Sequence, residues 1–406
     1  MTRTLRARWL LPIDGPPIEN GWIEIADDRI VAIGDGRPAG TAEDLGDVVV
    51  MPGLVNAHTH LELSWMAGLV PPAESFVAWV RTLMTERRRP RQELESLSFE
   101  AMMRAAEGAR ATGTVLIGDI SNSLTSPDVL RAAGLGGVVF HELLGFSEPD
   151  PEDRVRSAWV KADDAARRLQ LTSSGADDVV ISVCAHAPYS VSPALFTEIA
   201  KARRDAPLTV HAGESVEEME FLRTGAGPFL DFIRALGGDV SGWEPPDCDP
   251  VEYLNRLGYL QPDGLVVHGV QLSNAALGEL RAADAVLVTC PRSNTWVGAG
   301  TPSVTRFYAE GLRVAIGTDS LASVASLNMF DELAELRRLA PEVTAAQLLE
   351  SATKTGATAL GFGRDFGTLT AGKRAALVSV DLAGRARDVE EYLVSGVPPD
   401  RVRRVS

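Results

Sequence analysis

Short apolar runs alternate with helix-like stretches through most of the chain, and this alternation restricts the fold more than any other feature. Each run has the length of a strand buried on both faces, and the segments between them, such as SPALFTEIAKARR at 192–204, have the pattern of helices. Such alternation is typical of a parallel sheet covered by helices. The eight runs are 55–60, 114–120, 137–143, 179–186, 207–214, 265–269, 285–290 and 314–319. Eight such units predict an α/β fold, a (β/α)8 TIM barrel.

The two ends of the chain have a different pattern, which is typical of a small β unit. WIEIADDRIVAIG at 22–34 contains two β-rich runs around an Asp-Asp pair, which predicts a hairpin. GTLTAGKRAALVSVDL at 367–382 has the same character, with turn residues followed by an apolar run of strand length. We therefore expect a small β-sandwich domain from residues 1–50 and 366–406, and the barrel from residues 51–365.

Composition and charge exclude several classes of protein. The chain is 45% hydrophobic and 23% charged, as in ordinary soluble globular proteins, and its formal net charge of −16 would repel nucleic acid. WLLPI at 9–13 is shorter than a signal-peptide core, and the three cysteines have no paired metal-binding spacing. We therefore expect a cytoplasmic protein that acts on a small molecule, with no nucleic-acid or membrane partner. A homodimer is an expectation from base rates alone.

All six histidines lie at or beside the carboxyl ends of predicted barrel strands. TIM-barrel enzymes build their active sites on this rim. His58 and His60 end the first strand, and their spacing points both side chains to the same face. Asp319 ends the eighth strand, and the third to sixth strands end with His141, His186, His211 and His268. A single buried histidine is more often a hydrogen-bonded core residue, but six on one rim favour a functional site.

Histidines and a carboxylate form a nitrogen and oxygen donor set that suits Zn²⁺ or Fe²⁺ and leaves room for a water. Such an ion lowers the pKa of its water toward about 7 and creates hydroxide at neutral pH. No lysine lies on a predicted barrel strand, so a carbamylated-lysine bridge between two ions has no candidate. One ion is therefore the better interpretation. Glu142 is the only carboxylate placed to challenge it, and an outward-facing or structurally bonded side chain is its simpler role.

The stretch HAGES at 211–215 places Glu214 directly after the fifth strand. A carboxylate there can take a proton from a water and deliver it to a substrate nitrogen, and burial would raise its pKa for that work. Alternatively, Glu214 is only an acidic residue at the start of the helix that Ser215-Val-Glu-Glu opens. Its position beside His211 favours the catalytic role.

Five motifs follow one another on the predicted strands: VMPGLVNAHTHLELS, TVHAGES, VVHG, CPRSN and IGTDS. By these motifs the chain resembles the amidohydrolase superfamily, in its metal-dependent deaminase and chlorohydrolase branch. The resemblance implies Glu214 as proton shuttle, His268 as the group that holds or polarises the hydroxide, and Asp319 as a further proton acceptor. It also implies one divalent ion, zinc or alternatively iron, bound by His58, His60, His211 and Asp319.

Within that branch, HLELS, FVAWV, HAPYSVS and EEMEFLRTGAGP are similar to aminodeoxyfutalosine deaminases and adenosyl-nucleoside deaminases. The resemblance implies deamination of an adenine-bearing nucleoside: aminodeoxyfutalosine, adenosine, S-adenosylhomocysteine or methylthioadenosine. Hydroxide would add to the ring carbon that bears the amino group, Glu214 would protonate the adjacent ring nitrogen, and ammonia would leave. Trp79 is a further candidate for the pocket wall. The expected substrate contacts are His186, Trp65, Arg292 and Asn294.

Other functions use the same parts. A chlorohydrolase or a cyclic-amide hydrolase acting on another amino-heterocycle would need the same ion and hydroxide. A metal-binding scaffold without catalysis would need neither Glu214 nor His268, so their presence counts against it. The substrate contacts also have structural alternatives: a core role for His186, packing for the tryptophans and a salt bridge for Arg292.

Overall fold

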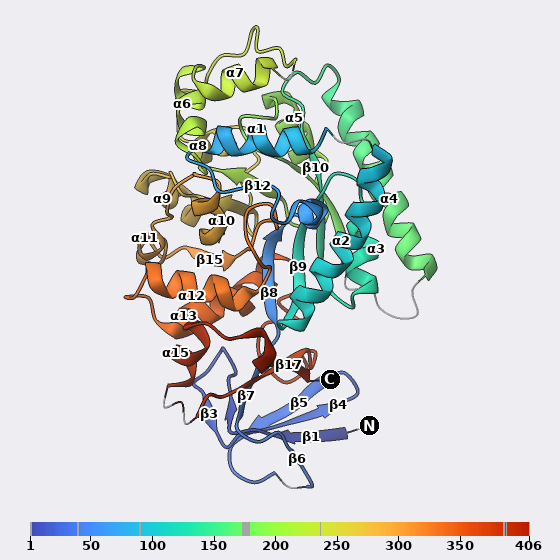
Figure 1. The fold of residues 1–406 in the computed structure, drawn as a ribbon, viewed down its shortest axis with the longest axis vertical. Helices are drawn as coiled ribbons and strands as arrows, with labels where there is room; N and C mark the ends of the chain where they lie inside the picture. Colours follow the sequence, from blue (N-terminus) through green and yellow to red (C-terminus); the bar gives the residue numbers. More distant parts are fainter. Residues whose placement is uncertain are drawn as a thin grey trace.

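A barrel of eight parallel strands forms the larger part of the computed structural model (Figure 1). The structure describes residues 2–38, 40–88, 91–172, 179–235, 237–384, 386 and 388–405. Each barrel strand coincides with one of the eight apolar runs, so the predicted fold class is confirmed. The strands are β8 (Leu54–Thr59), β9 (Thr114–Ser121), β10 (Gly136–Leu143), β11 (Val179–Ala185), β12 (Thr209–Ala212), β13 (Leu265–His268), β14 (Val286–Thr289) and β15 (Arg313–Ile316).

Two four-stranded sheets, β11-β10-β9-β8 and β12-β13-β14-β15, close the barrel. At one seam, the backbone N–H of His211 donates to the carbonyl oxygen of His186 at 2.9 Å. At the other, Thr59 and Asp319 form a parallel bridge. Both seams therefore lie at or beside residues that the sequence singles out as functional.

The barrel strands are apolar throughout because both of their faces are buried. Val267 and Val288 belong to one apolar cluster of buried side chains. The preceding residue on each strand points the other way, and Val266 and Leu287 pack with side chains of the covering helices. One of these helices, α5 (Pro193–Lys201), corresponds to the helical segment predicted at 192–204, and another is α9 (Asn274–Ala282).

The two ends of the chain share a small β unit, which lies below the barrel in Figure 1. Its sheets have the orders β5-β4-β1-β6 and β17-β16-β7-β2-β3. The predicted hairpin is present, with Asp27 in a left-handed conformation (φ 55°) in its turn. The domain boundaries stay a prediction. The strands are β1 (Thr2–Arg6), β2 (Trp9–Leu10), β3 (Ile18–Glu19), β4 (Trp22–Ala26), β5 (Arg29–Gly34), β6 (Glu43–Asp44), β7 (Val48–Pro52), β16 (Leu377–Asp381) and β17 (Val402–Val405).

Three helices, α1 (Phe76–Glu86), α6 (Val216–Thr224) and α7 (Pro228–Ala235), lie together at the end of the barrel farthest from the small β unit (Figure 1). Aromatic side chains from all three share one apolar cluster, which we call the apolar cap: Phe76, Trp79, Phe221 and Phe229. No described helix has both the length and the apolar composition needed to cross a membrane. The other α-helices are α2 (Arg91–Ala111), α3 (Ser126–Ala132), α4 (Pro151–Thr172), α8 (Pro250–Arg256), α10 (Pro291–Trp296), α11 (Val304–Ala309), α12 (Met329–Leu339), α13 (Ala345–Glu350), α14 (Gly356–Ala359) and α15 (Val389–Val394).

Candidate active site

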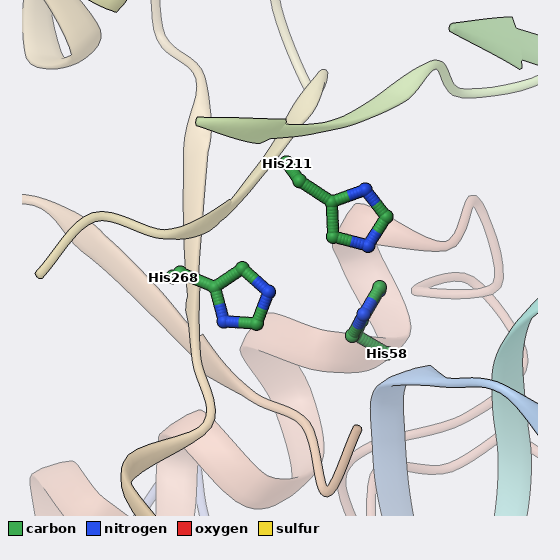
Figure 2. A group of neighbouring side chains, drawn as sticks. All are labelled: His58, His211 and His268. Atoms are coloured by element: carbon green, nitrogen blue, oxygen red, sulfur yellow. The ribbon is translucent and has the colours of Figure 1, made fainter. Parts of the chain in front are cut away.

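Four histidines and an aspartate converge at the carboxyl ends of β8, β12, β13 and β15. Ligand atoms of His58, His211 and His268 lie within 4.8 Å of one another, and so do those of His58, His60 and Asp319. Nε2 of His60 is 3.3 Å from Nε2 of His211, and Oδ1 of Asp319 is 3.5 Å from Nε2 of His60. Figure 2 shows the rings of His58, His211 and His268 gathered around one space. The fold thus brings together all four residues predicted to bind the ion.

The backbone is strained at two of these positions. His268 and Asp319 have φ angles of 80° and 60°, in the left-handed region that residues other than glycine seldom adopt. Such strain costs on the order of 1–3 kcal/mol and is common at functional sites. Asp319 is held by its backbone N–H, which donates to the carbonyl oxygen of His58 at 3.1 Å. Its Oδ2 accepts from Ser293 Oγ at 2.5 Å and Ser323 Oγ at 3.1 Å, so Oδ1 stays directed at the histidines.

The protonation states of the cluster suit a divalent cation. Burial lowers the pKa of His58 and His60 well below the usual range and lowers that of His211 to about 4, so the rings are neutral. Nδ1 of His211 lies 2.9 Å from the carbonyl oxygen of His186, which fixes the proton there and leaves the Nε2 lone pair facing the cluster. Nε2 of His58 is buried without a hydrogen-bond partner in the described structure. An unpartnered ring nitrogen among neutral histidines and a carboxylate fits a divalent metal ion.

Glu214 lies beside this cluster and faces His268. Its Oε1 is 3.5 Å from Nε2 of His268, and the two side chains are only 4% and 2% exposed. Burial, and then the negative charge of Asp319, raise the pKa of Glu214 well above its usual range. Asn294 Nδ2 lies 2.9 Å from Nδ1 of His268 and fixes the orientation of that ring. The site therefore holds a buried carboxyl group whose raised pKa favours the protonated form, next to the candidate metal ligands.

Glu218 supports this site and was missed by the sequence analysis. Its fully buried carboxylate accepts from the backbone N–H of Gly213 at 3.1 Å and of Glu214 at 2.9 Å. Ser215 caps helix α6 by accepting from the Glu218 N–H at 3.2 Å. The signal was available, because Ser-x-x-Glu is the capping-box pattern. Here the glutamate reaches past the cap residue and fixes the backbone of Glu214.

Glu218→Ala is expected to lower the free energy of unfolding by roughly 2–5 kcal/mol, because two buried N–H groups lose their acceptor. Urea unfolding of the purified protein measures the loss. The matched control is Glu220→Ala, in the same helix but exposed, which should change stability by about 0.5 kcal/mol or less. Equal effects of the two substitutions would contradict a supporting role for Glu218.

A cavity of about 500 Å³ opens onto the cluster. Its floor includes Glu214, His268 and Asp319. Apolar side chains from α1, α7 and the loop after β10 make up much of its wall: Phe76, Trp79, Val80, Leu83, Phe146 and Phe232. Apolar walls with a few converging polar groups are typical of a small-molecule binding site.

Some of the residues predicted to contact the substrate border the cavity, and others do not. His186 borders the cavity, as does Trp79, and Nδ1 of His186 lies 2.5 Å from Ser190 Oγ. Among the described residues that line the cavity, Trp65 and Asn294 are absent. Trp65 packs against the apolar cap, and Asn294 lies behind the histidine ring that it orients. The prediction of direct substrate contact is therefore corrected for Trp65 and Asn294.

Arg292 also lies elsewhere, and its predicted substrate contact is wrong. Its Nε donates to Oε1 of Glu332 at 2.8 Å, and its Nη2 donates to the carbonyl oxygen of Ser326 at 2.7 Å. Glu332 is fully buried and needs this partner. The arginine thus joins α10 to α12, which is the structural salt bridge that the sequence analysis kept as the alternative.

The third strand places its glutamate, not its histidine, in the cavity. Glu142 borders the cavity and is 6% exposed, so the expected outward-facing side chain needs correction, whereas the expected structural hydrogen bond is present. Asn122 Nδ2 donates to its Oε2 at 3.1 Å. His141 points to the other side of β10, with Nδ1 3.2 Å from the carbonyl oxygen of Ser121. Five of the six histidines therefore gather at the candidate site and one does not.

Known proteins share this architecture. The sequence model of the amidohydrolase family matches residues 49–403. The aminodeoxyfutalosine deaminase of Deinococcus radiodurans is 31% identical over 333 residues, which cover 79% of this chain and 75% of that protein. The 5-methylthioadenosine/S-adenosylhomocysteine deaminase of Moorella thermoacetica is 28% identical over 420 residues, which cover 95% of this chain and 91% of that protein. The crystal structure of Helicobacter pylori aminofutalosine deaminase with methylthio-coformycin superposes with a TM-score of 0.85 at 24% identity, and each chain is covered completely.

Proposed function

The chain belongs to the amidohydrolase family, and we propose that it is a metal-dependent hydrolytic deaminase of an adenine-bearing nucleoside. The observation that carries the proposal is the buried Glu214, with its raised pKa, 3.5 Å from His268 and beside a cluster of neutral histidines. The deaminase names of the relatives from Deinococcus and Moorella support the same reaction.

We assign one ion to four side chains, and propose zinc because three histidine nitrogens and one carboxylate oxygen are common zinc ligands. When bound, the ion would acidify a water and supply the nucleophile at neutral pH. We assign His268 to that water, because its Nε2 faces Glu214. The four proposed ligands are His58, His60, His211 and Asp319.

The chain's own groups would move the protons of the reaction. Asp319 accepts a proton from the attacking water through Oδ1, since its Oδ2 is already engaged by two serines. Glu214 gives its proton to the ring nitrogen next to the carbon under attack and regains one from the hydroxyl group of the adduct, while the proton held by Asp319 passes to the departing amino group. A carbon–oxygen bond forms, the carbon–nitrogen bond breaks, and ammonia leaves. The apolar cavity wall would hold the base and exclude bulk water.

Turnover of a substrate panel tests the proposal. Metal-loaded protein is incubated with adenosine, methylthioadenosine, S-adenosylhomocysteine, aminodeoxyfutalosine and a chlorinated aminotriazine, and ammonia and chloride release are followed. Release of ammonia from at least one nucleoside is the expected result. Chloride release alone, or no turnover by fully metal-loaded protein, would overturn the proposed reaction.

Arg87 is the only lysine or arginine among the described residues that line the cavity. With Arg292 engaged by Glu332, Arg87 is the candidate partner for a carboxylate on the substrate. Arg87→Ala should lower kcat/KM about 10–100-fold for a nucleoside whose 5′ substituent ends in a carboxylate, as expected for a lost hydrogen bond to a charged group. Methylthioadenosine, whose 5′ substituent is neutral, should lose much less. Arg88→Ala is the matched control, because Arg88 is exposed and outside the cavity lining; an equal loss in both variants would contradict the assignment.

A further inference from the structure

Glu142 has one carboxylate oxygen without a partner, although the side chain is only 6% exposed. Its Oε2 accepts from Asn122 Nδ2 at 3.1 Å, whereas Oε1 has no hydrogen bond in the described structure. The side chain borders the cavity that opens onto the metal cluster. An unpaired buried acceptor costs about 1–3 kcal/mol, so a group that enters the cavity is the natural partner of Oε1.

A second metal ion is one candidate for that partner, but the available ligands are too few. Ligand atoms of Glu142, His186 and His211 lie within 4.8 Å of one another. Nδ1 of His211 is 3.8 Å from Oε1 of Glu142 but only 2.9 Å from the carbonyl oxygen of His186, to which it is committed. Nδ1 of His186 lies 2.5 Å from Ser190 Oγ. Glu142 Oε1 and the other nitrogen of His186 remain, and two ligands do not make a closed metal site.

The position of Glu142 relative to His211 indicates which part of a substrate would reach it. Glu142 lies on the Nδ1 side of the His211 ring, whereas Nε2 of that ring faces the proposed ion. The proposed reaction puts the ring carbon on the Nε2 side of His211, beside Glu214, and we therefore place the sugar on the opposite side of the ring, toward Glu142. Leu144 and Phe146, from the loop that follows β10, also line the cavity. Neutral hydroxyl donors suit such a mixed surface.

We propose that Glu142, held by Asn122, accepts hydrogen bonds from the sugar hydroxyl groups of the substrate and so selects ribonucleosides over dideoxynucleosides. This inference rests on the proposed deaminase function. Glu142 would then determine specificity by binding the hydroxyl groups of the substrate's sugar. A site built to bind a hydroxyl group discriminates strongly against an analogue without it, because the buried acceptor is then left unpaired.

The test compares kcat/KM for adenosine and 2′,3′-dideoxyadenosine in wild-type protein, Glu142→Ala and Glu142→Gln. Wild-type protein should prefer adenosine by at least about 100-fold, and Glu142→Ala should reduce that ratio below about 10. Glu142→Gln should give an intermediate ratio, because an amide oxygen still accepts but carries no charge.

Glu148→Gln is the matched control, because Glu148 belongs to the loop that follows the same strand but is outside the cavity lining. Its Oε1 accepts from the Asp150 N–H at 3.4 Å. The adenosine to dideoxyadenosine ratio of Glu148→Gln should remain that of the wild type. The metal content of every variant is measured by elemental analysis.

Each outcome separates the two proposals. Deamination of both nucleosides with a ratio that Glu142→Ala leaves unchanged would overturn the hydroxyl assignment and leave the deaminase function intact. A second ion in wild-type protein that is lost in Glu142→Ala would assign Glu142 to metal binding instead. Failure of fully metal-loaded wild-type protein to deaminate any adenine nucleoside would overturn the proposed function, and this inference with it.

Discussion

Glu214→Gln is expected to lower kcat/KM for the best adenine nucleoside by about 10²–10⁴, the usual contribution of a general acid–base group. Glutamine keeps the shape of the side chain and can still contact His268, which lies 3.5 Å away. It cannot hand a proton to the ring nitrogen. Metal content should stay at the wild-type level, because Glu214 is outside the proposed ligand set. Initial rates of ammonia release and elemental analysis on the same preparation measure both quantities.

The same substitution distinguishes deamination from displacement of chloride. A departing chloride needs no proton, so a chlorohydrolase should lose less rate than a deaminase when Glu214 is replaced. Glu217→Gln is the matched control, since Glu217 is a buried neighbour in the first turn of α6 without an assigned role. Wild-type rates in Glu214→Gln, or loss of the ion from it, would remove Glu214 from the role of proton shuttle.

The barrel could be predicted from the sequence because its strands are apolar on both faces. A run such as LVVH at β13 is apolar at every position before its histidine, and this pattern allows few alternatives once eight such runs alternate with helices. The apolar cap could not be predicted as one structure. Phe76 and Phe229 meet through helices that are far apart in the chain, and no local pattern specifies that contact.

The candidate ligands could be predicted for the same reason as the barrel. The end of a barrel strand fixes where a side chain lies, so His58, His211 and Asp319 must approach one another once the strands are known. Residues on loops and short helices have no such constraint. Arg292 follows a strand end in the sequence, but α10 turns its side chain toward Glu332 on α12.

Adjacent residues on one strand pose a different problem. His141 and Glu142 must point to opposite faces of β10, and the sequence does not specify which of them faces the cavity. We counted His141 among the histidines of the functional rim and gave Glu142 an outward-facing or structurally bonded side chain as its simpler role. The structure places Glu142 inward, where Asn122 binds one of its oxygens, and turns His141 toward the backbone of Ser121. The packing of the whole barrel thus decides which alternate side chains of a strand face the cavity.

His58→Asn is expected to abolish metal binding and to lower deaminase activity by at least about 10⁴, beyond the general acid–base term, because the nucleophile is lost as well. His58 belongs to two of the three groups of converging ligand atoms, and its buried Nε2 has no hydrogen-bond partner in the described structure. Zinc should also stabilise the wild-type protein by about 2.7 kcal/mol at a hundredfold excess over Kd, and should not stabilise the variant. Elemental analysis and thermal unfolding with and without zinc measure these effects.

His141→Asn is the matched control for that experiment, because it removes a histidine from the same rim that lies outside the cluster. We expect this control to keep its ion and its stabilisation by zinc. The comparison separates loss of a ligand from the general cost of replacing a buried histidine, since both side chains are buried and lie on neighbouring parts of one barrel. Full metal content in His58→Asn, or loss of the ion from His141→Asn, would place the ion elsewhere in the molecule.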